Sequence, residues 1–481
     1  MIIPQEELIT VLAQFNPWWR QKSIPDLPSW HRAAFHEVFD WLYQPPAPRA
    51  VLLSGARQIG KTTLLLQAID KLIKKGVDPA NILYATFDHP IIKLAGMDAV
   101  LEAWRAREPK VEGEEYLLLD EAQFIRDWGT WVKHQVDFNK HRRIIFTGSA
   151  MPLLHDKQES GVGRWHTIRL TTLSFFEYLQ IKKLALPRLP ALNSLEELFT
   201  WPEKKFYEAA ETAHAYIGHF HEYLIRGGFP QTDLVESIHQ AQRLLREDII
   251  DKVLKRDMTA LFGVRRVLEL EQTFLYLCLH DGGILDMPDL CSNLAVKRPT
   301  AQHFIELLEA THLIYRLQPY GYGKDILRGK FKIYMADAAI APAVLLKGKS
   351  MLDDPAALGV ATETAVFKHL YARLYPQHIR FTYWRGTKDL EVDLIAEMGD
   401  RIIPFEVKYR AQHTGLRDLK GLLELCEKKS VKHGFVITKS LSDFGLLKNT
   451  NLNHTSIMRI PAALLCYWMG EAEVTQPDSF Y

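Results

Sequence analysis

One segment of the sequence has the residue types and spacing of a phosphate-binding loop. The apolar run Ala50–Ser54 leads into Gly-x-x-x-x-Gly-Lys-Thr, and a helical pattern follows up to Lys74. Glycines let the backbone turn around an anion, and the helix N-terminus adds partial positive charge there. We expect Lys61 to reach the β- and γ-phosphates of ATP, or the β-phosphate of ADP, and Thr62 to hold Mg²⁺. The residues expected to bind the nucleotide are Gly55, Ala56, Arg57, Gln58, Ile59, Gly60, Lys61, Thr62 and Thr63.

Two carboxylates follow a second apolar strand, Tyr116–Leu119. Parallel sheets bind ligands beyond the carboxyl ends of their strands, so Asp120 is expected to orient the Mg²⁺ shell. Glu121 is expected to polarise the attacking water as the catalytic base. A third strand ends in Thr147-Gly148-Ser149, where Thr147 or Ser149 could touch the γ-phosphate or the water. A plain turn after a core strand explains these two residues equally well.

An arginine on a glycine loop is a candidate for transition-state stabilisation. Arg164 follows the loop 159–163 and precedes the predicted strand His166–Leu170. A guanidinium can neutralise the charge that develops on a transferring phosphoryl group. In ring-forming ATPases such a finger acts on the neighbouring subunit, so this role would imply a homo-oligomeric ring. The alternative is an ordinary surface arginine.

A second set of charged residues lies on two predicted C-terminal strands. Asp393 lies within Leu390–Ile395, and Glu406 and Lys408 lie within Ile403–Tyr409. Residues two apart in a strand point to the same face, so these three side chains could converge. Two carboxylates would hold Mg²⁺ or Mn²⁺, and Lys408 would activate water or stabilise the phosphate.

This set resembles the PD-(D/E)xK nuclease pattern, in which Glu363, on the predicted helix Thr362–Leu374, would complete the metal shell. A nuclease fold that no longer cleaves is the alternative.

The elements that must position these residues predict an α/β protein. Strands and helices alternate over residues 49–170, which favours a parallel sheet covered on both faces. The five predicted segments are an N-terminal segment and linker (1–48), a P-loop ATPase core (49–170), a helical lid (171–240), a winged helix (241–345) and a nuclease-like α/β domain (346–481).

The predicted winged helix is a candidate DNA reader. Its three helices are Val267–His280, Asp286–Ala295 and Pro299–Thr311, and an alternating hairpin follows them. Residues 297–332 contain seven Lys and Arg against three acids, a net charge of +4. Such a basic surface is typical of phosphate contacts. A protein-packing role for the same module is the alternative.

Composition limits the remaining classes. The 481 residues carry a net charge of +1, and the four cysteines show no metal-binding spacing. No run of 18 apolar residues predicts a membrane span, and the N-terminus has no export pattern, so we expect a cytoplasmic protein without a membrane partner. The tryptophans near residue 18 are expected to pack onto the next domain rather than to bind a ligand.

The chain resembles the AAA-type (ASCE P-loop) ATPases with a C-terminal domain of the DUF4143 class. The resemblance rests on five segments, residues 55–62, 117–123 (LLLDEAQ), 147–150 (TGSA), 163–177 and 227–230 (GGFP). It implies the ATPase core, lid, winged helix and nuclease-like domain given above. It also implies that Gly228 and Pro230 lie near the nucleotide, with Arg226 as a lid sensor, although a structural turn explains GGFP equally well.

Three functions are consistent with these features. The first is an ATP-driven DNA-processing protein that uses ATP and Mg²⁺ and whose C-terminal domain cuts DNA. The second is a nucleotide-switched regulatory ATPase whose C-terminal domain binds DNA or protein without cleavage. The third, a non-enzymatic DNA-binding scaffold, is disfavoured because Asp120, Glu121, Asp393, Glu406 and Lys408 are all intact.

Overall fold

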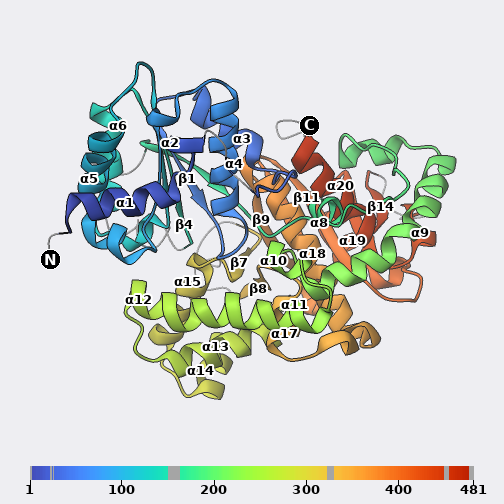
Figure 1. Ribbon diagram of the computed structural model, residues 1–481. Coiled ribbons are helices and arrows are strands. Elements are labelled where there is room, and N and C mark those ends of the chain that lie inside the picture. The colour runs from blue at the N-terminus through green and yellow to red at the C-terminus, as the bar shows by residue number, and fades with distance from the viewer. Residues whose placement is uncertain are drawn as a thin grey trace. The chain divides into compact units, whose positions relative to one another are not determined.

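The structure is a computed structural model that describes residues 3–21, 24, 26–149, 163–321, 330–448 and 454–475. The chain divides into two compact units. The first contains residues 1–171, 257–263 and 310–312, and the second contains residues 172–256, 264–309 and 313–481. Both units combine helices with a sheet (Figure 1), so the predicted α/β class is confirmed.

The first unit is built on a parallel sheet of five strands in the order β2-β3-β4-β1-β5. The strands are β1 (Ala50–Ser54), β2 (Ile82–Thr86), β3 (Glu115–Asp120), β4 (Arg142–Gly148) and β5 (Trp165–Arg169). Strands β1 and β3 are buried along their whole length, as expected for a parallel sheet with helices on both faces. Strands β1, β3 and β5 each begin and end within one residue of the strands that the sequence predicts.

Helices cover both faces of this sheet (Figure 1). They are α1 (Gln5–Phe15), α2 (Trp18–Gln21), α3 (Phe35–Tyr43), α4 (Lys61–Lys74), α5 (Pro90–Arg107) and α6 (Trp128–Phe138). Helices α1, α5 and α6 contribute to one hydrophobic core, and α3 packs against α4, β1 and β4. The N-terminal segment is therefore part of the first unit.

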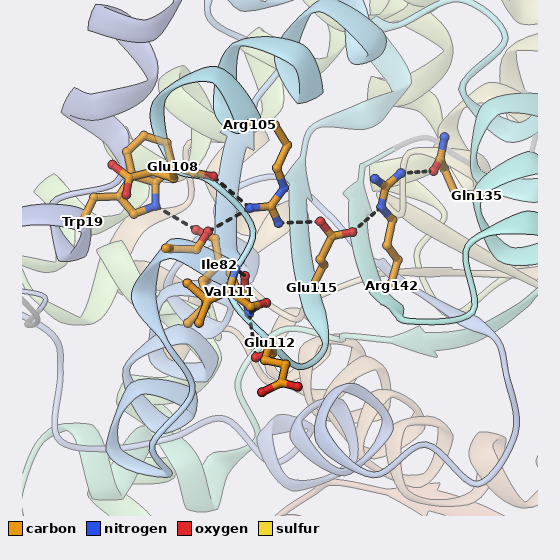
Figure 2. Close-up of polar contacts among 11 residues, drawn as sticks. Trp19, Ile82, Arg105, Glu108, Val111, Glu112, Glu115, Gln135 and Arg142 are labelled. Carbon is orange, nitrogen blue, oxygen red and sulfur yellow. Dashed lines mark hydrogen bonds and ion pairs between the residues drawn. The ribbon is translucent and has the colours of Figure 1, made fainter.

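The N-terminal tryptophans pack onto the edge strand β2. Trp18 is fully buried, and its indole N–H donates to the carbonyl of Ile82 at 3.2 Å. The indole of Trp19 donates to the same carbonyl at 3.0 Å, as Figure 2 shows. These contacts agree with the packing role expected for the tryptophans.

A buried carboxylate ties the edge of the first sheet together (Figure 2). Glu115, at the start of β3, accepts from Arg105 of α5 at 2.5 Å and from Arg142 of β4 at 2.7 Å. Arg142 also donates to Gln135 of α6 at 2.5 Å. Burial alone would raise the pKa of Glu115, but its hydrogen bonds and ion pairs with Arg142 and Arg105 outweigh burial and lower it. Glu115 thus links two helices to two strands.

The second unit contains a sheet of nine strands in the order β13-β14-β12-β11-β10-β9-β7-β8-β6. The strands are β6 (Ile284–Leu285), β7 (Ile314–Pro319), β8 (Phe331–Met335), β9 (Arg380–Arg385), β10 (Glu391–Met398), β11 (Arg401–Lys408), β12 (His433–Thr438), β13 (Gly445–Leu446) and β14 (Ser456–Pro461). Its directions are mixed, because β9, β10 and β11 are antiparallel whereas β11, β12 and β14 are parallel. The predicted hairpin and the predicted nuclease strands therefore belong to one sheet.

Four helices of the second unit overlap the helices that the sequence predicts over residues 267–280, 286–295, 299–311 and 362–374. The helices of this unit are α8 (Phe175–Ile181), α9 (Glu203–Arg226), α10 (Pro230–Asp233), α11 (Ile238–Leu244), α13 (Val267–Leu279), α14 (Met287–Leu294), α15 (Arg298–Ala310), α17 (Ile340–Val344), α18 (Pro355–Leu374), α19 (Lys420–Lys429) and α20 (Ala462–Thr475). Residues 184–190 form the loop that the sequence predicts between the first two helices. Strand β9 is absent from the sequence-based prediction.

Two further helical segments lie between α11 and α13. Leu245–Asp257 is π-helical, and α12 (Met258–Phe262), which follows it, lies in the first unit. Within the described ranges, no helix is both long enough and apolar enough to span a membrane.

We expect Glu115→Ala to lower the free energy of unfolding by about 3 kcal/mol, because it leaves two largely buried arginines without their carboxylate. The side chains of Arg105 and Arg142 are 21% and 19% exposed, which places the loss at the lower end for a buried pair. Denaturant titration of the full chain measures this change. Glu102→Ala, at an exposed position of α5, is the matched control.

The Glu115 contribution should also depend on pH in a definite direction. Because the folded pKa lies below the ordinary value of 4.5, the stabilisation is complete above 4.5 and is lost as the pH falls through the folded value. A stability difference between wild type and Glu115→Ala that does not shrink at low pH would contradict this role.

Candidate functional site

The predicted phosphate loop lies between β1 and α4. Gln58 and Gly60 have positive φ angles of 59° and 95°, so the chain turns through left-handed conformations before the helix begins at Lys61. A Cβ on Gly55 would stand 2.3 Å from the carbonyl oxygen of Leu170, so only glycine fits there. The strand–loop–helix context that the motif requires is present.

Lys61 lies inside this loop with 4% of its surface exposed. Its ammonium donates to the carbonyl oxygens of Gly55 at 2.8 Å and Ala56 at 2.7 Å. Burial lowers the pKa of Lys61, and the nearby carboxylates of Glu121 and Asp120 oppose that shift. The loop thus holds a positive charge at the position where a phosphate would need it.

Asp120 is buried, at 2% exposure, and accepts hydrogen bonds from three hydroxyl groups. Thr62 of α4 donates to it at 2.7 Å and Tyr84 of β2 at 2.9 Å. The hydroxyl of Thr147 on β4 donates to its second oxygen. The structure therefore brings together Thr62 and Asp120, the two residues predicted to hold Mg²⁺.

Glu121 follows β3 in a left-handed conformation, with φ of 54°. Its backbone N–H donates to the hydroxyl of Thr147 at 3.0 Å, and its carboxylate accepts from the side-chain amide of Gln123. The same amide donates to the hydroxyl of Ser149 at 3.3 Å. Of the two hydroxyl candidates, Thr147 contacts both acids, whereas Ser149 contacts the residue that orients Glu121.

Two residues far along the chain complete the surroundings of the loop. Arg57 donates to Asp257 at 2.9 Å, and the Asp257 side chain is almost fully buried. Ser54, just before the loop, bonds to the imidazole of His312 at 2.9 Å. Burial, with Arg169 and Lys61 nearby, lowers the pKa of His312 to about 3, so its ring is neutral at physiological pH. Sequence spacing could not have revealed either partner.

Arg164 lies near the amino-terminal end of β1, whereas the phosphate loop lies at the carboxyl end of that strand. Its backbone carbonyl accepts from the N–H of Ala50, the first residue of β1. Its side chain is 40% exposed and pairs with Asp137 at 2.6 Å. If Arg164 is an arginine finger, it must therefore contact a nucleotide bound to a second copy of the chain. Residues 159–162 of the preceding loop lie outside the described residues.

The residues of the GGFP segment have structural partners within the second unit. A Cβ on Gly228 would stand 2.4 Å from the carbonyl oxygen of Leu173, and the Gly228 N–H donates to Asp337 at 2.9 Å. Pro230 begins α10. Arg226 is buried and bonds to Glu222 at 2.6 Å and to the carbonyl of Val235 at 2.8 Å. These contacts support the structural-turn alternative, and a nucleotide role stays a prediction.

The predicted C-terminal set does assemble on β10 and β11. Because Leu394 pairs with Phe405 in the antiparallel ladder, Asp393 and Glu406 are cross-strand neighbours. Asp393 accepts from the backbone N–H of Val407 at 2.8 Å, and Lys408 pairs with Glu406 at 2.5 Å.

A lysine that the sequence did not mark lies among these acids. Lys332 of β8 is 1% exposed, and its ammonium lies 2.9 Å from Glu363, 2.8 Å from Glu391 and 3.0 Å from Asp393. Burial disfavours its charged form, but Asp393 and Glu363 outweigh burial and raise the pKa of Lys332 well above its usual value. We call the group of Lys332, Glu363, Glu391, Asp393, Glu406 and Lys408 the carboxylate cluster.

The acids of the cluster respond differently to their surroundings. Burial and the charge of Asp393 raise the pKa of Glu406 to about 8. Burial and Asp393 also raise the pKa of Glu363. Burial would raise the pKa of Asp393 as well, but Lys332 and Lys408 outweigh it and lower that pKa. Of these three acids, Asp393 is the one whose pKa the two lysines lower below its ordinary value.

Comparison with known families divides the chain into three parts. Residues 47–179 match a family described as "AAA domain". That region contains the five-stranded parallel sheet and the phosphate loop. It is an AAA-type ATPase domain. Residues 217–351 match a domain of unknown function, DUF8612, and residues 358–461 match a domain of unknown function, DUF4143, so the predicted DUF4143 resemblance is confirmed.

Relatives match over more than the AAA domain alone. An uncharacterized protein of Haemophilus influenzae is 27% identical over 375 residues, which are 74% of this chain and 82% of the relative. An uncharacterized protein of Mycobacterium tuberculosis is 26% identical over 385 residues, 78% of this chain and 73% of the relative. Among solved structures, a DNA replication initiation factor covers 69% of this chain and 90% of its own, with 12% identity and a TM-score of 0.24.

The residues of the AAA domain fit a nucleotide with Mg²⁺. The loop offers a buried ammonium and a helix N-terminus to phosphate, and Thr62 and Asp120 offer oxygen ligands 2.7 Å apart. The carboxylate cluster offers oxygens of the right kind for a divalent cation, including one buried Glu406 oxygen that has no hydrogen-bond partner. Among the described residues, however, no three His, Cys, Asp or Glu side chains converge in a metal-binding geometry.

We expect Lys61→Ala to weaken ATP binding to the AAA domain by about 10- to 100-fold, the loss of one charge-assisted contact. Isothermal titration calorimetry with Mg²⁺ and ATP measures this affinity. Lys75→Ala, at an exposed position just after α4, is the matched control and should bind as wild type does. If wild type and Lys61→Ala bind ATP with equal affinity, the loop at residues 55–62 is not the nucleotide-binding site.

Proposed function

We propose that the protein is a Mg²⁺-dependent ATPase whose nucleotide state controls a DNA-engaging second unit. The observation that carries the proposal is the arrangement of Lys61, Thr62 and Asp120 at the carboxyl ends of β1 and β3, with Glu121 beside them. This arrangement supplies each group that phosphoryl transfer to water requires, namely a charge for the phosphates, ligands for the metal and a base for the water.

The chain's own residues divide this work. Lys61 neutralises the β- and γ-phosphates, and Glu121 accepts the proton of the attacking water. Thr147 donates to Asp120 and accepts from the backbone of Glu121, so one hydroxyl keeps the two acids in fixed relation. Gln123 orients the Glu121 carboxylate. Bound Mg²⁺ would supply the charge that stabilises the transferring phosphoryl group.

The Arg57–Asp257 pair is a candidate nucleotide-dependent contact within the first unit. The guanidinium lies in the phosphate loop and is held by a buried carboxylate 200 residues later in the chain. A bound triphosphate would offer the same guanidinium a further anionic partner, besides Asp257 and Asp88. The pair would therefore be strained or released according to the nucleotide state, and Asp257 ends the π-helical segment Leu245–Asp257.

We infer that the described residues 264–321 and 330–335 form a winged helix that contacts DNA. The element order α13-β6-α14-α15-β7-β8, with β6 and β7 both antiparallel to β8, supports this assignment. Helix α15 buries its apolar face, and Lys297, Arg298, Gln302 and His303 are exposed. Residues 324 and 328, which contribute to the predicted basic charge, lie outside the described residues.

A nucleotide-switched ATPase with a non-cleaving C-terminal domain is the second candidate. The observation that favours it is Lys332, whose ammonium contacts two of the three acids predicted to hold a nuclease metal. Glu363, expected to complete a metal shell, is bonded to Lys332 and to the hydroxyl of Tyr334 instead.

We expect Glu121→Gln to reduce the rate of ATP hydrolysis by about 100-fold or more while ATP affinity stays within twofold of wild type, because a general base acts on turnover rather than on binding. Phosphate release and calorimetry measure the two quantities. Glu112→Gln, at an exposed position before β3, serves as the control. If Glu121→Gln hydrolyses ATP at the wild-type rate, Glu121 is not the catalytic base.

We expect Lys297→Ala combined with Arg298→Ala to weaken DNA binding and to reduce its salt dependence by about two counter-ions. Fluorescence anisotropy at several salt concentrations measures both. The double variant Lys204→Ala and Lys252→Ala, at exposed positions of the second unit outside the winged helix, is the control. If the wild-type chain binds neither single-stranded nor duplex DNA at low salt, DNA engagement fails while the ATPase assignment stands.

A further inference from the structure

The ammonium of Lys332 lies between the carboxylates of α18 and β10 and offsets their negative charge. It is within 3.0 Å of three carboxylates, Glu363 on α18 and Glu391 and Asp393 on β10. Glu391 and Asp393 contact the same ammonium, so both side chains point toward Lys332. A buried ammonium with three carboxylate neighbours is held by charge from several directions.

The cluster still contains more acidic than basic groups. Four carboxylates face two lysines, because Lys408 pairs only with Glu406 while Lys332 contacts the other three acids. Glu406 is 5% exposed, and one of its oxygens is buried without a hydrogen-bond partner. An unpartnered buried carboxylate oxygen is costly, and a cation in contact with it would remove that cost.

A divalent cation and the Lys332 ammonium would compete for the same oxygens. Asp393 directs one oxygen to Lys332 and the other to the backbone N–H of Val407. Glu363 directs the oxygen that Lys332 contacts to Tyr334 as well. Metal bound by Asp393 and Glu406 would therefore lie next to a fixed positive charge, and like charges at such distances repel strongly in a buried site.

We propose that Lys332 is a built-in counter-ion that closes the carboxylate cluster to divalent metal until its ammonium is withdrawn. The inference rests on the proposed role of Asp393 and Glu406 as metal ligands. Lys332 belongs to β8, the second strand of the proposed wing, and β8 pairs with β7 from Met335 to Lys332. Displacement of this hairpin, as on DNA binding, is the movement that would withdraw the ammonium.

The test is Mn²⁺ binding by the full chain, with Lys332→Met compared with wild type. Removing the ammonium while keeping the side-chain length should tighten Mn²⁺ binding at least tenfold, measured by calorimetry and by electron paramagnetic resonance of the free ion. Lys330→Met removes an exposed lysine two residues away, which pairs with Asp286, and should bind as wild type does. Lys332→Arg retains the charge and should show no gain.

A second readout covers the case in which Lys332→Met is unstable without metal. Saturating Mn²⁺ should then raise its melting temperature more than it raises that of wild type, because only the variant needs the added cation. The double variant Lys332→Met and Glu391→Gln lowers the unmatched charge, keeps Asp393 and Glu406, and should also bind Mn²⁺ more tightly than wild type.

Equal Mn²⁺ affinity in wild type and Lys332→Met, or no binding by either, would overturn the inference. ATP hydrolysis by the same variants tests the proposed function separately, since the phosphate loop lies in the first unit. If Lys332→Met gains Mn²⁺ and cuts no DNA, the counter-ion role stands and the nuclease hypothesis fails. If it gains both, Lys332 is an autoinhibitory contact on a working nuclease.

Discussion

The structure of the first unit depends on one buried carboxylate. Asp120 has almost no access to water, so its charge must be met by donors inside the protein. Hydroxyl groups from α4, β2 and β4 meet it, and they bring the start of the phosphate-loop helix to the ends of two neighbouring strands. The hydrogen bonds that Asp120 accepts thus fix the geometry of the nucleotide site.

In the second unit, by contrast, the acids of the carboxylate cluster are not fully matched by donors. These acids, of which Glu406 is buried and the others are partly buried, lie on α18, β10 and β11 and outnumber the lysines of the cluster. Where Asp120 is saturated with neutral hydroxyl donors, Glu406 retains an oxygen without any partner. Such a difference indicates a rigid set of polar contacts around Asp120 and a charge-sensitive one around Glu406.

Features carried by short stretches of sequence were predictable. The phosphate loop, the paired acids and the alternating strands each depend on residues close in the chain, and the structure contains the predicted strand–loop–helix and the cross-strand placement of Asp393 and Glu406. Strand β9 was missed because its sequence, RFTYWR, carries arginines at both ends and resembles a surface segment, although Thr382 and Trp384 are buried.

The sequence did not predict several side chains that contact the candidate site residues. All of them are distant in the sequence and come close to those residues only when the chain folds. Tyr84 reaches Asp120 from a neighbouring strand, Asp257 reaches Arg57 across 200 residues, and Lys332 enters the cluster from a hairpin. No periodicity marks such side chains. A lysine in a strand that otherwise consists of apolar and aromatic residues, β8, is a local sign of such a partner, since lysine is rarely buried without a paired acid.

The shared nine-stranded sheet limits how the chain can be dissected. Strand β7 pairs with β9 through Gln318 and Pro319, and β8 carries the lysine that reaches β10. A fragment beginning at residue 346 would lose both, leaving β9 with an open edge and four acids with one lysine between them. Such a fragment would be prone to aggregate and would bind cations in a way that the intact chain does not.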